Sequence, residues 1–284
     1  MKKHLTIFVA IIGFATPLLA GGGWTQPKGK GFLKISQGAI IADRYFTPAG
    51  DLVDITTTAL YTSAVYLEYG LTDRLSTVAY VPFFVRSTLN KVEVVDSNGA
   101  LLDEEPGDEL NAIGDVDLSI KYGLITEGPL VLSASLTLGL PLGEQAGGQT
   151  ELLQSGDGEF NQLVTLELSR GLASGFYWTL LAGFNNRTNN FSDEFRYGGE
   201  IGWVNEKWIP IIKVYGIASL MNGDDAFVPN NGVFGNNIEF LSVTPELNYQ
   251  MNDKMGISVS AGFAAFGKRV LGNPNFIAGI YFRL

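Results

Sequence analysis

The side chains of this sequence that could do chemistry are carboxylates, amines and guanidinium groups, because there is no cysteine and the only histidine is His4. His4 lies within residues 1–20, which have the features of a removable export signal, so the mature chain holds neither an imidazole nor a thiol. Ser-His triads, Cys-His pairs and His-based zinc or haem sites are therefore excluded. We expect no enzymatic activity, no cofactor and no metal site.

Two acidic stretches are candidates for ligand binding. The segment 103–109 is rich in carboxylates, which suit Ca²⁺, but it lacks the spacing of any defined calcium loop. A solvated external loop is the favoured interpretation there, as it is for Asp224-Asp225. Gly156-Asp157-Gly158 resembles a phosphate-cradling turn, yet it neither follows a buried parallel strand nor opens a helix, so we interpret it as a turn.

Many of the other charged residues alternate with apolar ones, which is the pattern of a strand with two different faces. It is clearest in residues 130–142, where Leu or Ala occupies every second position from Leu130 to Leu142, opposite Ser133, Ser135 and Thr137. Residues 115–124, 195–203, 255–264 and 276–284 repeat it. An apolar face opposite a face of small and charged residues is what a lipid-facing barrel strand requires.

Such strands must close into a barrel, because hydrocarbon offers no hydrogen-bond partners to an open sheet edge. With the apolar face toward lipid, the alternate charged positions point into the lumen. The lumen-lining candidates are Lys34, Glu68, Asp115, Asp117, Lys121, Glu167, Arg196, Glu200, Lys213, Glu246 and Arg283. They could form a path that orients a solute or a salt-bridged network that only holds the barrel shape. The second role is favoured, because the architecture requires interior charge in either case.

Short and long connections alternate along the chain. Tight turns are expected at 72–73, 126–128, 173–175, 205–207 and 252–253. Longer polar connections are expected near 45–55, 89–113, 143–158, 186–193, 222–237 and 267–274. This order requires about twelve strands, with both chain ends on the periplasmic, short-turn side. The predicted fold is therefore an all-β, antiparallel, up-and-down transmembrane β-barrel over residues 31–284.

Residues 1–20 are predicted to be a signal peptide, with Lys2 and Lys3 before an apolar run and Ala20 before the expected cleavage point. Residues 21–30 would then form a periplasmic N-terminal segment. Removing the signal leaves 17 basic and 29 acidic residues, a net charge of −12, which argues against a nucleic-acid partner. We expect a location in a Gram-negative outer membrane. The expected partners are its lipid and lipopolysaccharide, the barrel assembly machinery and a small hydrophobic solute.

Aromatic residues and prolines refine this expectation. Aromatic side chains favour the membrane interface, and those expected at the periplasmic rim are Tyr69, Tyr122, Phe176, Trp203, Trp208, Tyr249 and Phe282. A path for a hydrophobic solute could be lined by Phe83, Phe84, Tyr177 and Tyr215, although packing or a place in the girdle is favoured. Strand ends or bulges are expected at Pro82, Pro141, Pro210 and Pro245, because each proline removes a ladder donor. Residues 75–85 are apolar on both faces, so alternation does not decide which of their side chains face the lipid and which face the lumen.

One part of the chain resembles a known family. Residues 113–122 (IGDVDLSIKY), Gly139-Leu140-Pro141 and Gly156-Asp157-Gly158-Glu159 are similar to the sequence motifs of the outer-membrane family named for the meta-pathway of phenol degradation. The turn at 71–75 and Val81-Pro82 are similar too, so the resemblance spans roughly residues 60–172. It implies a signal-bearing outer-membrane barrel that transports aromatic or other hydrophobic compounds, and it carries no catalytic residues.

Three functions remain open at this point. The leading hypothesis is an outer-membrane channel or transporter that passes small molecules passively. The second is a structural or adhesive barrel with an occluded lumen and partner-binding external loops, and the third is a soluble exported β-sandwich. A barrel lipase is excluded, because its chemistry needs a histidine base that the mature chain lacks.

Overall fold

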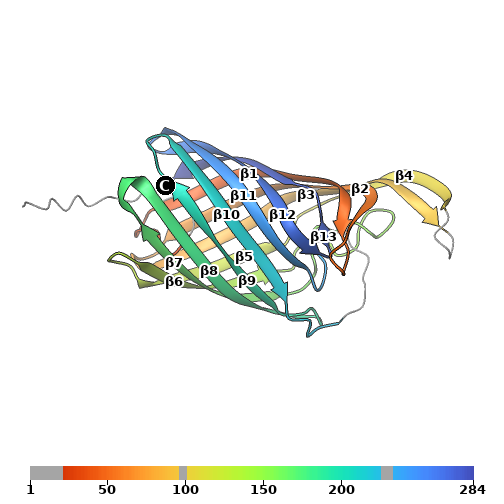
Figure 1. Ribbon diagram of the computed structural model, residues 1–284, viewed down its shortest axis with the longest axis horizontal. Coiled ribbons are helices and arrows are strands. Elements are labelled where there is room, and N and C mark those ends of the chain that lie inside the picture. The colour runs from red at the N-terminus through yellow and green to blue at the C-terminus, as the bar shows by residue number, and fades with distance from the viewer. Residues whose placement is uncertain (1–21, 96–100, 225–232) are drawn as a thin grey trace, which may run out of the picture.

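Antiparallel strands form the wall of a closed barrel in the computed structural model, which describes residues 22–95, 101–224 and 233–284 (Figure 1). The signal peptide predicted for residues 1–20 lies outside the described residues, as does part of each of the connections expected at 89–113 and 222–237. Within the described ranges, no helix is long and apolar enough to cross a bilayer. The ladder closes where β1 pairs with both β2 and β14, so the soluble β-sandwich is ruled out.

Twelve long strands make the wall. They are β1 (Gly31–Phe46), β2 (Leu52–Gly70), β3 (Leu75–Val95), β5 (Val116–Ile125), β6 (Val131–Leu140), β7 (Asn161–Gly171), β8 (Phe176–Arg187), β9 (Glu194–Trp203), β10 (Trp208–Ser219), β11 (Glu239–Asn252), β12 (Met255–Lys268) and β14 (Asn275–Arg283). Two further strands, β4 (Leu101–Ala112) and β13 (Val270–Leu271), and a 3₁₀ turn at Ala173–Gly175 lie outside this set. The five tight turns are confirmed, and they gather at the end of the barrel that holds both ends of the wall.

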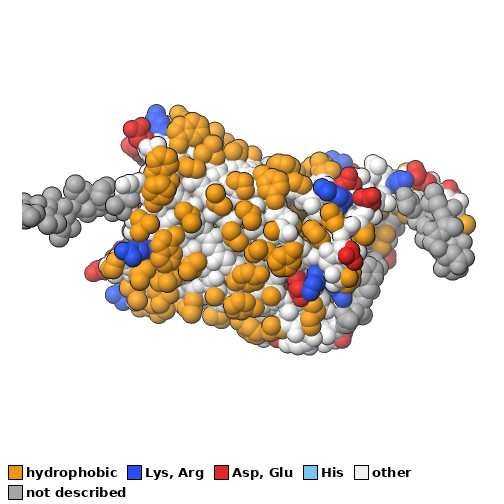
Figure 2. Space-filling model, in the orientation of Figure 1, with side chains coloured by type: hydrophobic (Ala, Val, Ile, Leu, Met, Phe, Trp, Pro, Cys, Tyr) orange, Lys and Arg blue, Asp and Glu red, His pale blue; other side chains and the backbone are white. Residues whose placement is uncertain are grey.

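The outer surface is apolar where the alternation predicts it. Ile120 and Ile201, at outward-facing positions, are 58% and 63% exposed, whereas Ser133 and Glu68, at lumen-facing positions, are fully buried. Figure 2 shows hydrophobic side chains spread over the barrel wall, with charged ones gathered toward its two ends. In the described ranges the wall closes its own ladder and presents an apolar face outward, as hydrocarbon requires, which places the protein in the outer membrane.

The stretch 89–113 differs from the expected loop, because most of it forms a β-hairpin. The upper part of β3 pairs with β4 beyond the barrel rim, and this hairpin projects from the long-loop end in Figure 1. Cross-strand ion pairs support it, with Arg86 Nη2 at 2.7 Å from Glu109 Oε2 and Lys91 Nζ at 2.7 Å from Glu104 Oε2. Strands that are solvated on both faces need no apolar face. Their polar sequence therefore lacks the alternation that would have predicted strands here. Similarly, β13 occupies part of the loop expected at 267–274 and pairs with β1.

The prolines interrupt the sheet in two of the four expected places. Pro82 lies in a β3 bulge between the Val65–Val81 and Ser63–Phe84 pairs, and Pro141 follows the last residue of β6. The bulge changes the facing of β3, which explains why residues 75–85 gave no clear phase. At Pro210 and Pro245 the expectation of a bulge or strand end was wrong, because β10 and β11 pair through both without a register shift. Instead, Pro210 lies just outside the β9 ladder, and pairing with β12 lapses at Pro245 and resumes in register.

Aromatic rings line the short-turn rim, several of them in contact. Phe176 stacks on Trp203 with ring centroids 5.5 Å apart, and Trp208 lies 4.6 Å from Tyr249. The four rings considered for a hydrophobic path divide between the two faces of the wall. Phe83 and Phe84 are exposed on the outside, as girdle residues are.

Candidate functional site: the barrel lumen

The lower half of the lumen holds a layer of carboxylates and ammonium groups. Seven of the predicted lumen residues make up this layer, four carboxylates and three lysines: Glu68, Glu167, Glu200 and Glu246, with Lys34, Lys121 and Lys213. Lys121 Nζ lies 2.6 Å from Glu167 Oε2, and Lys213 Nζ lies 2.9 Å from Glu246 Oε2. These pairs link strands on the barrel interior, so part of the charge holds the wall together.

The segment of residues 22–30 enters the short-turn end of the barrel, with residues 22–26 buried or half-buried and residues 27–30 exposed at the rim. Its backbone amides donate to lumen-facing side chains, from Gly23 to Ser169 Oγ at 2.7 Å and from Gln26 to Ser76 Oγ at 2.9 Å. The amide of Lys28 donates to Asp73 Oδ1 at the β2–β3 turn. Residues expected to be a periplasmic segment therefore lie against the inner wall and cover its charged layer.

Close approach explains the glycines of this segment. Gly22 has a φ of +75°, and a Cβ there would lie 2.5 Å from Thr179 Oγ1; a Cβ at Gly23 would lie 2.7 Å from the Glu167 carbonyl oxygen. The Gly22 carbonyl accepts a hydrogen bond from Lys121 Nζ. Trp24 then packs edge-on against Tyr177 with ring centroids 5.9 Å apart, so Tyr177 lies inside the lumen.

Glu68 is the most enclosed charge of this layer. It is fully buried, and its Oε1 has no hydrogen-bond partner among the described residues. The Tyr66 hydroxyl lies 3.4 Å from its other oxygen, and Gln26 of the N-terminal segment lies against it. Removing the segment would therefore expose Glu68 to water.

At the long-loop end, the β6–β7 connection, residues 141–160, folds inward and is fastened to the wall. Asp115 accepts hydrogen bonds from the amides of Gly143, at 2.8 Å, and Asp157, at 2.9 Å. Asp108 of β4 accepts from the amides of Gln149 and Thr150 and from the Thr150 hydroxyl. Burial alone would raise the pKa of Asp108, but these bonds and one from the Glu109 amide lower it to about 2.

Arg187, at the end of β8, joins this loop to the next pair of strands. Its guanidinium contacts Glu159 at 2.7 Å, and Asp157 and Glu194 at 2.8 Å each, and it is only 4% exposed. Glu194 also accepts from Arg196 at 2.8 Å. Burial raises the pKa of Asp157 to about 7, with Glu159 adding to the rise, although Arg187 opposes it.

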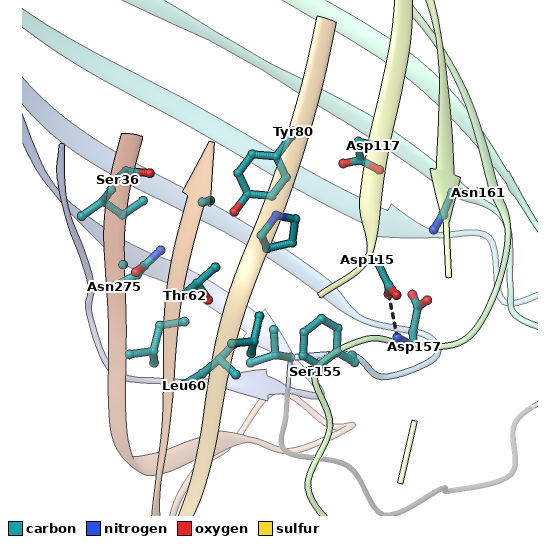
Figure 3. Close-up of a pocket in the computed structure, with 18 of the residues that line it drawn as sticks. Ser36, Leu60, Thr62, Tyr80, Asp115, Asp117, Ser155, Asp157, Asn161 and Asn275 are labelled. Atoms are coloured by element: carbon teal, nitrogen blue, oxygen red, sulfur yellow. Dashed lines mark hydrogen bonds between the residues drawn. The ribbon is translucent and has the colours of Figure 1, made fainter. Parts of the chain in front are cut away.

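Above the lower layer, the barrel encloses a cavity of about 380 Å³. Figure 3 shows Asp115, Asp117 and Asp157 on one side of it and Ser36 and Thr62 on the other. A second cavity, of about 310 Å³, adjoins it along β10–β14, where Tyr215 and Phe240 are among its lining residues. The upper lumen is therefore a hollow with a charged side and a largely neutral side.

The predicted site residues thus fall into separate layers. Asp115, Asp117 and Arg196 line the upper cavity. The other eight lie lower, with Arg283 next to the rim and its Nε without a hydrogen-bond partner in the described ranges. Sequence reasoning missed Arg187, Glu159 and Glu194, because they lie in or beside connections where no alternation assigns a face. It also predicted only a turn at Gly156-Asp157-Gly158, whereas Asp157 in addition forms an ion pair with Arg187. Glu159 within the quoted GDGE motif was the one available signal.

No protein-family model matches the sequence, and no curated protein matches it either. Among solved structures, the fold is similar to that of an outer-membrane channel from Pseudomonas putida F1, with a TM-score of 0.59 at 14% identity over 94% of this chain and 98% of that one. The NanC porin matches with a TM-score of 0.53 at 9% identity, covering 89% of this chain and 100% of that one. The KdgM porin, solved with oligogalacturonate, gives 0.51 at 6% identity over 88% and 98%. At these identities the similarity concerns the fold, which is that of an outer-membrane β-barrel.

Proposed function

We propose that this protein is an outer-membrane channel through which small molecules pass passively. The observation that carries the proposal is the upper lumen, where two adjoining cavities of about 380 and 310 Å³ lie inside a closed barrel wall. A barrel that served only as an anchor would need no such hollow. The fold shared with channels and porins supports the proposal, as does the mature chain's lack of histidine and cysteine.

For the solute, we propose small hydrophobic or aromatic compounds. The resemblance of residues 60–172 to the family named for phenol degradation suggests this class. The upper cavities support it with apolar lining residues, among them Ile40, Leu60 and Phe240. Tyr215 adds an aromatic face to the same space.

The alternative, a structural or adhesive barrel, is favoured by two other observations. Residues 22–30 occupy the short-turn end of the lumen, and the β3–β4 hairpin projects beyond the rim. Under this alternative the lumen stays occluded and the hairpin presents its exposed charged side chains to a partner. Lipopolysaccharide contact with the wall and recognition of the C-terminal strand by the assembly machinery are compatible with both functions.

Conductance separates the two functions. Mature protein that shifts its gel mobility on heating, and is therefore folded, would be inserted into planar bilayers and liposomes. We expect discrete conductance steps and uptake of small aromatic solutes, with heat-denatured protein as the control. Folded protein that passes neither ions nor solutes would overturn the channel and leave the adhesive barrel.

A further inference from the structure

The upper cavity has an unequal distribution of charge. The carboxylates on or just behind its lining are Asp115, Asp117, Asp157, Glu159 and Glu194, and the cations are Arg187 and Arg196. Five carboxylates against two guanidinium groups leave three uncompensated negative charges when all are ionised. A cleft lined by one sign of charge focuses the field of such a set on the space it encloses.

Only one of these carboxylates is free to meet a ligand. Both oxygens of Asp115 accept backbone amides of the inward-folded loop, and Asp157 pairs with Arg187. Asp117, on β5, accepts no hydrogen bond within the described ranges, although it lines the cavity. The positive charge of Arg196 acts on Asp117, but its guanidinium donates its hydrogen bonds to Glu194 instead. Asp117 is therefore a carboxylate that faces the hollow without a bonded partner.

The facing wall is neutral and partly apolar. Across from Asp117, the cavity is lined by Ser36, Leu60 and Thr62 of β1 and β2 (Figure 3). Ile277 of β14, which pairs with β1, also lines it. The adjoining cavity shares Ile40, Val233 and Asn275 with it, so the apolar lining continues toward Phe240. The volume of the first cavity lies within the roughly 300–1,000 Å³ typical of small-molecule sites.

We propose that this cavity binds small organic cations with an apolar body, its ammonium end beside Asp117 and its hydrocarbon or ring against the neutral wall of β1, β2 and β14. The inference deepens the proposed channel function, because it names the charge class of the solute. An anion would be repelled by the uncompensated carboxylates. An uncharged aromatic would bind less tightly than a cation, because it would leave Asp117 unpaired in a partly desolvated site. Tyr80 and Tyr215, which line the two cavities, offer ring faces of the kind that attract cations.

Binding in detergent tests the proposal without relying on transport. Isothermal titration of the mature protein would compare 3-phenylpropylammonium, 3-phenylpropan-1-ol and 3-phenylpropionate, which share a phenyl ring on a short chain and differ in charge. We expect the ammonium to bind at least about tenfold more tightly than the other two. The preference should weaken with added salt, because it is electrostatic.

The variant Asp117→Asn removes the free carboxylate and should lower the affinity for the ammonium about tenfold, with little effect on the alcohol. Asp51→Asn, on the exposed β1–β2 turn, removes the same charge far from the cavity and should change nothing. Equal binding of the three probes, or an Asp117→Asn variant that binds the ammonium as the parent does, would overturn the inference. A protein that binds the ammonium but conducts nothing would overturn the channel alone, and one that conducts without this preference would overturn the inference alone.

Discussion

At the scale of single residues, burial decides which of the many ion pairs matter. Arg187 and Arg86 both contact carboxylates at about 2.7–2.8 Å, but the side chain of Arg187 is 4% exposed and that of Arg86 is 49% exposed. Three carboxylates converge on Arg187, so its loss would leave them close together with little solvent to separate them. When an exposed pair such as Arg86–Glu109 is broken, by contrast, water solvates both charges, so little stability is lost.

We therefore expect Arg187→Ala to lower the free energy of unfolding by about 3–5 kcal/mol, as breaking a buried ion pair does. The matched control Arg86→Ala should cost less than about 1 kcal/mol. Urea-induced unfolding in lipid vesicles, followed by tryptophan fluorescence, would measure both. Equal losses in the two variants would contradict the role assigned to Arg187.

The raised pKa of Asp157 predicts a pH-dependent selectivity. Because burial raises this pKa to about 7, Asp157 is neutral below that pH and adds a negative charge to the upper cavity above it. The preference for K⁺ over Cl⁻ should therefore grow as pH rises from about 6 to about 8. Reversal potentials in a KCl gradient would show it, and Asp157→Asn should remove the change with its midpoint near 7.

The same shift has a consequence for stability. The folded state holds the Asp157 proton more tightly than the unfolded chain, in which the pKa is near 3.8. The free energy of unfolding should therefore fall as pH rises between those two values and stay level above about 7. A K⁺ over Cl⁻ selectivity that stays flat between about pH 6 and pH 8 in the parent protein would refute the raised pKa of Asp157.

Sequence alone found the charges on regular strands better than those beside connections. The spacing of Asp115, Asp117 and Lys121 follows from alternation, since a strand's period of two assigns each residue a face. Arg187 lies at the end of β8 and Glu159 precedes β7, so their inward direction depends on how residues 141–160 fold back. That fold rests on contacts between segments far apart in sequence, which no local pattern encodes.

At the scale of elements, alternation predicted the strands that lipid constrains and missed the hairpin that water surrounds. A strand in the wall must show lipid one face and the lumen the other, so its sequence carries a strong period. The β3–β4 hairpin has no such requirement beyond the rim. Its stability depends on pairs such as Lys91 and Glu104, which look like ordinary loop charges when the partner strand is unknown.

The hairpin should be removable without affecting conduction. Leu89 pairs with Asp108 and Lys91 with Pro106, so deleting residues 91–106 joins Asn90 directly to Gly107. Asn-Gly is the favoured two-residue turn for a β-hairpin, and Asp108 keeps its bonds to the inward loop. We expect unchanged folding and unchanged single-channel conductance.

The control for this deletion is Asp108→Ala in the full-length protein. This change keeps the hairpin and removes the acceptor for Gln149 and Thr150, which should loosen residues 141–160 and increase current fluctuations. If deletion of residues 91–106 alters conductance more than Asp108→Ala does, the hairpin contributes to the pore.

At the scale of the whole molecule, the lumen contains two charged layers of different character. The lower layer nearly balances, with four carboxylates and three lysines, and it lies under the N-terminal segment. The upper layer is distinctly negative and open to the cavity. In the proposed channel, a solute that enters from the long-loop end would meet the upper cavity first and the covered layer second, so selection and restriction would belong to different parts of the barrel.

This arrangement predicts that residues 22–27 limit the current. Replacing them with a Gly-Ser linker of the same length keeps the chain leading to β1 but removes the Trp24 contact with Tyr177. The linker also removes the side chain of Gln26, which lies against Glu68. Single-channel conductance should rise severalfold, because the lower layer, including Glu68, becomes accessible to water. Trp24→Ala alone should give a smaller rise, since the Gln26 side chain still lies against Glu68. If the linker variant conducts like the parent, the restriction lies elsewhere, and the inward-folded loop at residues 141–160 would be the segment to shorten next.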